Sequence, residues 1–530
     1  MSLKQVGSGS EIDERLAALV TNASAVRAIA AAVEGTLGPK GLDTMLVDRF
    51  GEVIITNDGV TILDKMDVLH PAAKMVINIA KAQQEEVGDG TTTATVMAGA
   101  LVSEGANQVI RGVPVARVIE GMKIGIQKAL EGVKFRTKHI NELEDPILKQ
   151  IAMVAGRDHE DIADLVVNAT RLIGIEKVRE LNFKLSDTIT AEEGAENEVF
   201  MGVIIDKERM NKEMPREQDD IRLLIIDDAL DPEEIGDEAL GTESGFARYM
   251  QIQEEFKQNV HKIVELGVNL VLVDRGVQDL AEEILTDAGI MVLQRVAAKD
   301  LRRVAEHSGG RVIKRTGLKK ELIELEKYLG YANRVYEDEK LQQVRLVGGK
   351  GKPMATVLVG AATEEVVGER QRIAKDAAAS VQAAVRGGYV AGGGATELGV
   401  ARDVEKMRET IKGMSAYGVD CVSYALRRPL SQIVSNAGYN PLEKVEEVKA
   451  AQAGQQRDSL GIDCDTGEVV DMLDLGVVDP TPVKLHAIKA AGEVATAILR
   501  IDTIIKKREE GSRGGERAVM DQNDAGTPDF

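Results

Sequence analysis

The hydrophobic periodicity of the chain changes twice along its length, and this limits the folds open to it. Between residues 11 and 133, apolar side chains mostly recur with the spacing of amphipathic helices. Between residues 221 and 293, short β-branched and apolar runs replace this pattern, with one helical segment at 277–288. Helical spacing returns between residues 368 and 507. An α/β domain inserted into a helical domain produces this order, and so do three consecutive domains.

The length supports more than one domain, because 530 residues exceed what one hydrophobic core usually serves. In the first helical block, Asn22 and Ser24 are capping candidates that predict two helices within residues 11–34. Further helices are expected at 72–86, 92–105, 115–133, 368–386, 401–436 and 482–507. A β-hairpin is expected at 45–47 and 53–56, and strands at 221–226, 269–273 and 290–293.

Charge and composition exclude several functional classes. A net charge of −21 repels the phosphates of nucleic acids and anionic lipid surfaces. The first ten residues do not have the pattern of a secretory signal, and no apolar stretch is long enough to span a bilayer, so we expect a cytoplasmic protein without nucleic-acid or membrane partners. Cys421 and Cys464 lie far apart in sequence, which predicts neither a disulfide nor a zinc site.

The strongest local motif is the run Gly-Asp-Gly-Thr-Thr-Thr at residues 88–93, which leads directly into a helical pattern. Free amides at a helix start attract phosphate oxygens, and glycine lets the backbone approach them closely. Gly90, Thr91, Thr92 and Thr93 are therefore candidate phosphate contacts, and Asp89 is a candidate ligand of Mg²⁺. The alternative is an ordinary helix N-cap without a ligand.

Three further turns carry glycine next to polar groups. Residues 36–41 read Thr-Leu-Gly-Pro-Lys-Gly and form either a phosphate-wrapping loop or a plain helix C-cap. Residues 57–59 read Asn-Asp-Gly, a tight turn that projects a carboxylate. Residues 392–394 are three glycines that either accept a nucleobase or serve as a linker. Neither a P-loop nor a Rossmann glycine motif is present, so a nucleotide would bind by a less common arrangement.

In this order and spacing, the four turns resemble the nucleotide site of the chaperonins. The resemblance is nearly continuous from residue 57 to residue 93 and extends over nearly the whole chain. Its other matching segments are residues 212–216, 369–370, 376–377, 392–395 and 478–480. Only residues 229–245 and the C-terminal tail align loosely.

The resemblance implies a multidomain α/β fold and favours insertion over three consecutive domains. A mainly helical equatorial domain would comprise residues 1–142 and 388–530, with a disordered tail from about residue 509. A small intermediate hinge domain would comprise 143–202 and 353–387. An inserted α/β apical domain would occupy 203–352, with a helical lid protrusion at about 227–256.

The resemblance also implies roles for individual residues in ATP hydrolysis. Asp89 would bind Mg²⁺, while Asp58 and Asp376 would position the attacking water. The remaining nucleotide contacts would be Thr36, Leu37, Gly38, Pro39, Gly90, Thr91, Thr92, Thr93, Gly393 and Asp479, of which Gly393 and Asp479 would hold adenine and ribose.

The expected function is that of an ATP-dependent chaperone that encloses unfolded proteins in a double ring, expected to be a hexadecamer of identical subunits. Phe246, Met250 and Phe256 lie at helical steps in the predicted lid segment, which resembles the built-in lid of the group II chaperonins, so no separate co-chaperonin is expected. For the C-terminal half of this stripe, packing on the apical sheet is the favoured interpretation. Two functional alternatives remain: a scaffold without hydrolysis, and a chaperonin that needs a separate lid protein.

Two departures from group II indicate a divergent lineage of bacterial or archaeal source. That branch usually carries a lysine that senses the γ-phosphate just after the position of Met153, whereas this chain reads Val-Ala-Gly-Arg-Asp-His at residues 154–159. The hypothesis is that Arg157 replaces this lysine. In addition, the run of threonines at residues 91–93 is closer to the branch with a separate lid.

Overall fold

The computed structural model describes residues 4–5, 11–12, 15–47, 51, 53–233 and 242–504. The predicted tail from residue 509, and residues 234–241 of the predicted lid segment, lie outside this range.

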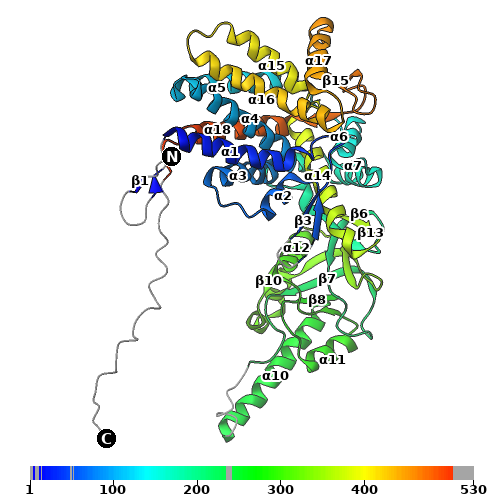
Figure 1. Cartoon of the computed structure of the whole chain (residues 1–530). Helices are drawn as coiled ribbons and strands as arrows, with labels where there is room; N and C mark the ends of the chain where they lie inside the picture. Colours follow the sequence, from blue (N-terminus) through cyan, green and yellow to red (C-terminus); the bar gives the residue numbers. More distant parts are fainter. Residues whose placement is uncertain are drawn as a thin grey trace, which may run out of the picture.

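Helices from both ends of the chain pack into one helical part (Figure 1). The N-terminal set is α1 (Arg15–Glu34), α2 (Gly59–Lys65), α3 (Pro71–Val87), α4 (Thr91–Ile110) and α5 (Val115–Arg136). The C-terminal set is α15 (Ala395–Arg408), α16 (Ser415–Asn436), α17 (Pro441–Gln455) and α18 (Thr481–Leu499). Helix α4 contacts α1, α3, α16 and α18, and a single hydrophobic core contains Val102, Val419 and Ala491.

Helix α1 corrects one sequence prediction, because it is continuous where two helices were expected. Asn22 is only 1% exposed and lies between Leu19 and Val26, which are also buried against the shared core. Packing of this face on α4 outweighs the preference of Asn22 and Ser24 for helix ends. By length and composition α1 could also span a membrane, but its packing in this core gives no sign of a membrane protein.

Short strand pairs connect the helices and place their ends. The predicted hairpin is confirmed as β3 (Thr44–Val47) and β4 (Val53–Thr56), paired antiparallel. Strand β14 (Tyr389–Ala391) pairs with β17 (Val478–Pro480), and β15 (Leu460–Ile462) pairs with β16 (Val469–Asp471). Near the N-terminus, β1 (Lys4–Gln5) pairs with β2 (Glu11–Ile12).

The middle of the chain forms a nine-stranded mixed sheet with the order β5-β13-β6-β12-β11-β7-β8-β9, and β10 pairs with β7. The strands are β5 (Ile189–Glu193), β6 (Glu198–Ile205), β7 (Glu217–Ile226), β8 (Leu270–Val273), β9 (Met291–Leu293), β10 (Val312–Ile313), β11 (Gly330–Asp338), β12 (Gln343–Val347) and β13 (Ala355–Ala361). Side chains alternate between the two faces of β7, so that Leu224 and Ile226 enter one core while Leu223 and Ile225 enter another.

Helices cover this sheet on both faces. Helices α10 (Glu243–Glu265) and α11 (Asp279–Asp287) pack on one core, and α12 (Ala298–Ser308) packs on the other. The short α13 (Leu322–Leu325) lies between the 3₁₀ turns η2 (Arg315–Lys319) and η3 (Glu326–Tyr328). Helix α10 extends away from the rest of the chain (Figure 1).

A third packed region joins the helical part to the sheet. It contains α6 (Ile147–Ala155), α7 (Glu160–Ile173), α8 (Ile175–Arg179), the turn η1 (Leu185–Thr188) and the long helix α14 (Glu364–Gly387). Its core combines residues before and after the α/β segment, including Ile151 and Ala377. Strands β5 and β13, where the chain enters and leaves the sheet, pair in parallel. The α/β segment is therefore inserted into the helical part.

Candidate functional site

The loop between α3 and α4 has the geometry of an anion site. Gly88 ends α3 and Gly90 precedes α4, both with left-handed backbone (φ 73° and 77°). A Cβ on Gly88 would lie 2.2 Å from the Cβ of Ala379, and one on Gly90 would lie 2.6 Å from Cγ1 of Val483, so both positions require glycine. No side chain caps the start of α4. The first backbone N–H groups of this helix can therefore bind an anion.

Asp89 points from this loop toward α14. Its carboxylate accepts hydrogen bonds from Ser380 Oγ at 2.9 Å and from the Gly90 amide at 2.5 Å. Burial, followed by the negative charge of Asp479, raises the pKa of Asp89. Its backbone carbonyl accepts a hydrogen bond from Gln83 Nε2 at 2.8 Å, which holds the loop in place.

The donor set around Asp89 fits Mg²⁺ bound together with phosphate. A divalent cation would offset both the desolvation of this carboxylate and its repulsion by Asp479. Within the described residues no group of three or more acidic, histidine or cysteine side chains is placed to hold a metal. Mg²⁺ typically binds through one or two carboxylates plus substrate phosphates and water, so such a group is not needed.

Asp58 lies beside the same helix start. It caps α2, accepting hydrogen bonds from the Thr61 amide at 2.9 Å and from Thr61 Oγ1 at 2.6 Å. The next residue, Gly59, packs so closely on α4 that a Cβ there would lie 2.4 Å from Thr92 Oγ1. The Asn-Asp-Gly turn is therefore held directly against the threonine run.

Asp376 approaches the site from α14. Arg372 Nη1 lies 2.8 Å from its carboxylate, and Gln84 Nε2 donates a hydrogen bond to it at 3.5 Å. Burial raises the pKa of Asp376 to about 8; Arg372 opposes this shift, while the charges of Asp89 and Asp58 add to it. Two other predicted site carboxylates, Asp58 and Asp89, therefore lie within electrostatic range of Asp376.

Two residues of this region were not predicted as site residues. Arg372 bridges Glu369 and Asp376, and Glu369 also pairs with Arg157 Nη1 at 3.3 Å. The sequence did contain a signal for them, since Glu369, Arg372 and Asp376 follow the i, i+3 and i+4 spacing of ion pairs along one helix face. Arg157 lies in the electrostatic field of both Asp376 and Asp58, and its role as a substitute for the lysine stays a prediction.

The glycines at 392–394 and Asp479 also come together. A Cβ on Gly392 would lie 3.0 Å from Asp479 Oδ2, because β14 and β17 are paired strands. Gly393 (φ 61°) faces Met472. Lys484 Nζ lies 2.7 Å from Asp479 and 2.6 Å from the fully buried Glu397, a buried ion-pair triad that sequence reasoning missed.

The loop at residues 36–41 packs against α16. A Cβ on Gly38 (φ 87°) would lie 3.0 Å from Ile433. Asn436 Nδ2 donates hydrogen bonds to the carbonyls of Glu34 at 2.9 Å and Leu37 at 2.8 Å. One turn before Ile433, Leu430 contacts Gly394, so both glycine loops lie on the same helix.

Thr36 and Pro39 complete this loop. Thr36 Oγ1 donates a hydrogen bond to the carbonyl of Val33 at 2.8 Å, which continues the end of α1, and Pro39 is exposed. The packing thus gathers the predicted residues into two groups. One group surrounds Asp89 and the other surrounds Gly393. The two groups lie near each other, since the negative charge of Asp479, in the second group, acts on Asp89 in the first.

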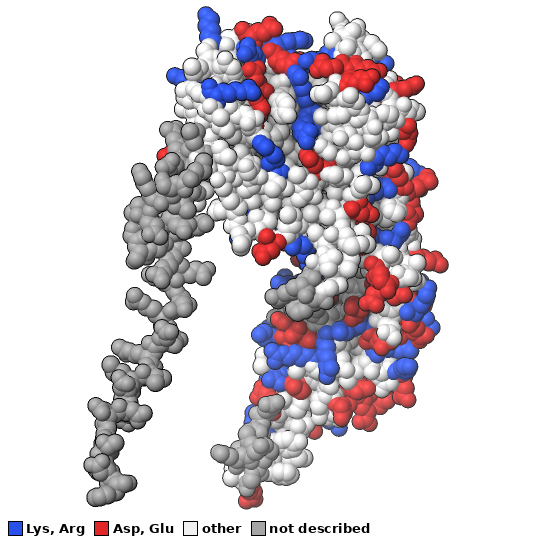
Figure 2. Space-filling view, viewed as in Figure 1, with Lys and Arg blue, Asp and Glu red and all other residues white. Residues whose placement is uncertain are grey.

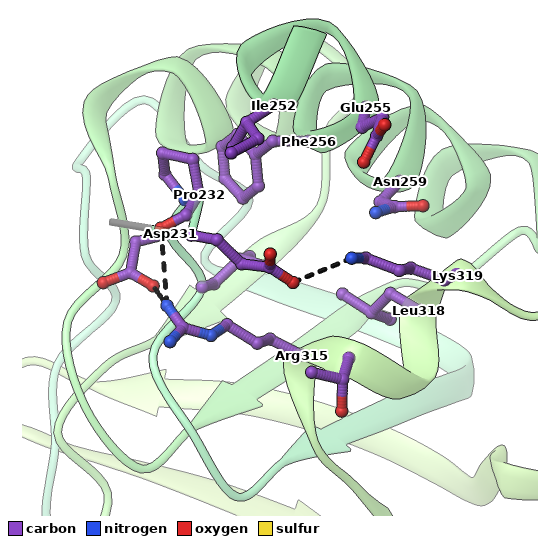
Figure 3. A pocket seen from close by; sticks show the side chains of 12 residues that line it. Asp231, Pro232, Ile252, Glu255, Phe256, Asn259, Arg315, Leu318 and Lys319 are labelled. Carbon is purple, nitrogen blue, oxygen red and sulfur yellow. Dashed lines mark hydrogen bonds and ion pairs between the residues drawn. The ribbon is translucent and has the colours of Figure 1, made fainter. Parts of the chain in front are cut away.

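A cleft lies far from these carboxylates, at the base of α10. Ile252 and Phe256 from α10 face Pro232 across it, while Arg315 and Lys319 from η2 form ion pairs with Asp231 and Glu233 (Figure 3). Phe256 is buried, whereas Phe246 and Met250, further toward the N-terminus of α10, are exposed. The C-terminal half of the predicted apolar stripe therefore packs on the sheet, as expected.

A second pocket lies between the β15–β16 hairpin and the end of α5. Its lining includes Arg136, Lys138, Asp458 and Asp471. Arg136 pairs with Asp458 at 2.5 Å, so charges of both signs offset each other there. Neither pocket includes a residue predicted for the nucleotide site.

Comparison with known proteins identifies the family of the chain. A thermosome subunit from Methanocaldococcus jannaschii is 36% identical over 516 residues, covering 93% of this chain and 94% of that protein. A thermosome subunit beta from Archaeoglobus fulgidus is 38% identical over 518 residues and 93% of each chain. A crystal structure of a group III chaperonin in the open state has a TM-score of 0.87 and 47% identity, covering 93% of this chain and 99% of that one. The TCP-1/cpn60 chaperonin family model matches residues 29–509, and the chain belongs to this family.

Proposed function

We propose that the chain is a subunit of an ATP-driven chaperonin that hydrolyses ATP and encloses unfolded proteins. One observation carries the proposal: Asp58 and Asp89 lie beside the uncapped start of α4, and both act electrostatically on Asp376 of α14. Phosphoryl transfer needs neutralisation of phosphate charge and a positioned nucleophile, and this arrangement offers both.

Each residue has a distinct role in the proposed reaction. The amides at Gly90–Thr93 and the loop at residues 36–39 hold the phosphates. Asp89 holds Mg²⁺, which supplies charge neutralisation when bound. Asp58 and Asp376 orient the attacking water, and Gly393 and Asp479 hold adenine and ribose. An ionised Asp376 can accept the proton of that water, and Mg²⁺ would favour this form by neutralising nearby negative charge.

Coupling to conformational change follows from the position of α14. This helix carries Asp376 and packs in the third core, with α6 and α7, rather than in the core of the helical part. We propose that this third region is the intermediate domain, at residues 143–202 and 353–387, between an equatorial domain (1–142 and 388–530) and an apical domain (203–352). Rotation of the intermediate domain would move Asp376 toward or away from the phosphates and so switch hydrolysis.

Assembly into rings is supported by the surface of the helical part. The face over α1 and α3 carries few charged side chains (Figure 2). Large apolar side chains on α1, the loop after it, the hairpin and the loop before α3 are exposed: Val20, Leu42, Met45, Val47, Val53, Ile55 and Leu69. Such a surface favours association with further copies of the chain. We propose a cytoplasmic double ring of sixteen identical subunits, closed by the segment at 227–256 without a separate lid protein.

The test combines hydrolysis with protease protection of residues 227–256 in the full-length protein without any co-chaperonin. We expect Mg²⁺-dependent phosphate release, a particle of near-megadalton size, and protection of this segment only with ATP or a transition-state mimic. Turnover without protection would instead support a separate lid protein. Absence of both nucleotide binding and turnover would support the alternative of a scaffold.

A further inference from the structure

Glu369 is held by two arginines at the edge of the carboxylate site. Arg372 contacts it through two nitrogens, Nε at 3.0 Å and Nη2 at 2.5 Å, and Arg157 contacts it through Nη1 at 3.3 Å. A planar guanidinium that grips two oxygens of a carboxylate can grip two oxygens of a phosphate in the same way. Glu369 therefore occupies the donors that a phosphate group would use.

The turn that delivers Arg157 is strained. Arg157 and Asp158 are consecutive non-glycine residues with left-handed backbone, at φ 53° and 60°. The turn is closed by hydrogen bonds from the Asp158 amide to Met153 O at 2.9 Å and from the His159 amide to Gly156 O at 3.1 Å. Backbone strain of this kind concentrates at functional sites, where the surrounding structure maintains it. In this turn, the left-handed backbone directs the guanidinium group of Arg157 from the α6–α7 turn toward α14.

The two guanidinium groups repel each other and need an anion between them. Burial, and then the charge of Arg372, lower the pKa of Arg157. Burial alone would raise the pKa of Glu369, but the hydrogen bonds and charges of Arg372 and Arg157 outweigh it and lower that pKa. Glu369 is therefore ionised, and both arginines also lie in the field of Asp58 and Asp376.

We propose that Glu369 is a positioning residue that takes the place of the terminal phosphate of ATP, holding Arg157 and Arg372 until nucleotide displaces it. This inference rests on the proposed function. It predicts that Glu369 competes with ATP for these guanidinium groups but not with ADP, which lacks the terminal phosphate. Removing the charge of Glu369 should thus favour the ATP-bound state selectively.

The experiment measures the Kd of AMP-PNP and of ADP, each with Mg²⁺, for the assembled full-length protein. Glu369→Gln should bind AMP-PNP at least about fivefold more tightly than the wild type, with the affinity for ADP little changed. Glu364→Gln, an exposed position on the same helix, is the matched control and should change neither value. On an Arg157→Ala background, Glu369→Gln should tighten AMP-PNP binding less, because one of the competing groups is gone.

Equal or weaker AMP-PNP binding by Glu369→Gln, at unchanged ADP affinity, would overturn the inference while leaving the proposed function intact. A wild-type protein that binds neither nucleotide would overturn both. If Glu369→Gln does not assemble, Glu369→Asp replaces it. The shorter carboxylate is less able to reach both arginines, so tighter AMP-PNP binding supports the inference and unchanged binding overturns it.

Discussion

Replacing Gly59 by alanine should slow hydrolysis by displacing Asp58 from the start of α4. The added Cβ would lie 2.4 Å from Thr92 Oγ1, 3.2 Å from Thr91 Oγ1 and 3.3 Å from the Thr92 amide nitrogen. Because ordinary contact begins near 3.5 Å, α2 and α4 must separate by about 1 Å wherever the Thr92 side chain keeps its rotamer. Rotation of the Thr92 side chain relieves the first contact only, since the amide nitrogen cannot rotate away.

A displacement of this size at a reacting group can cost roughly 10²-fold in rate. We therefore expect Gly59→Ala to lower kcat by about that factor, with a smaller effect on nucleotide affinity because Asp58 orients water rather than nucleotide. The assay is the initial rate of phosphate release as a function of ATP concentration, with thermal unfolding measured in parallel.

Two companion variants test the cause. Gly454→Ala, in α17, places its Cβ in open space and should leave the rate unchanged while stabilising the helix by up to ~1 kcal/mol. Combining Gly59→Ala with Thr92→Ala removes the closest contact, and the double variant should approach the rate of Thr92→Ala alone. Wild-type kcat in Gly59→Ala, at unchanged stability, would refute the reasoning that this contact positions Asp58.

Three other predictions concern the same site. Asp376→Asn should lower kcat by roughly 10²-fold or more, while the affinity for ADP stays near that of the wild type. Phosphate release measures the first quantity and fluorescent-nucleotide titration the second. Retained turnover would contradict the role of Asp376 in orienting the attacking water. Burial raises the pKa of Asp376 in the folded protein to about 8, above the pKa of an Asp side chain in the unfolded chain. The Asp376 carboxyl group therefore contributes its full share to the free energy of unfolding at pH values below its unfolded-state pKa. This contribution is lost as the pH rises through its folded-state pKa. Between about pH 5 and pH 9, the Tm of nucleotide-free wild type should therefore fall more than that of Asp376→Asn, and parallel curves would count against the shift. Asn436→Ala removes the hydrogen bonds to the carbonyls of Glu34 and Leu37, so it should raise the KM for ATP several-fold with little change in kcat. An unchanged KM would show that the loop at residues 36–39 does not contribute to the nucleotide site.

Local pattern predicted most of the secondary structure, because each element satisfies its own periodicity. The hairpin at β3 and β4 and the helices α3 to α5 begin and end close to the predicted positions. The expected continuous segment at residues 401–436 is wrong in one respect, since it is divided between Arg408 and Ser415 into α15 and α16. Helix α1 also differs, because packing against α4 overrode its capping residues. The predicted domain boundaries and the roles of the site residues stay predictions.

By itself, the sequence determined which residues have suitable local chemistry. Gly38, Gly88, Gly90, Gly393 and Gly394 all have the left-handed backbone that glycine adopts at little cost. Asp58 and Asp89 occur in turns that place a carboxylate next to a helix start, which follows from residues adjacent in the chain. Motif reading could identify these groups because turn geometry depends on short-range contacts.

Only the tertiary structure decided how these groups act on one another. The raised pKa of Asp376 requires its burial, and requires Asp89 and Asp58 nearby. Glu369 joins Arg157 to Arg372 only because α6 packs on α14. The triad of Lys484, Glu397 and Asp479 likewise forms where α15, β17 and α18 meet. Desolvation and ion pairing between distant segments depend on how helices and strands pack in space, and local sequence patterns do not carry that information.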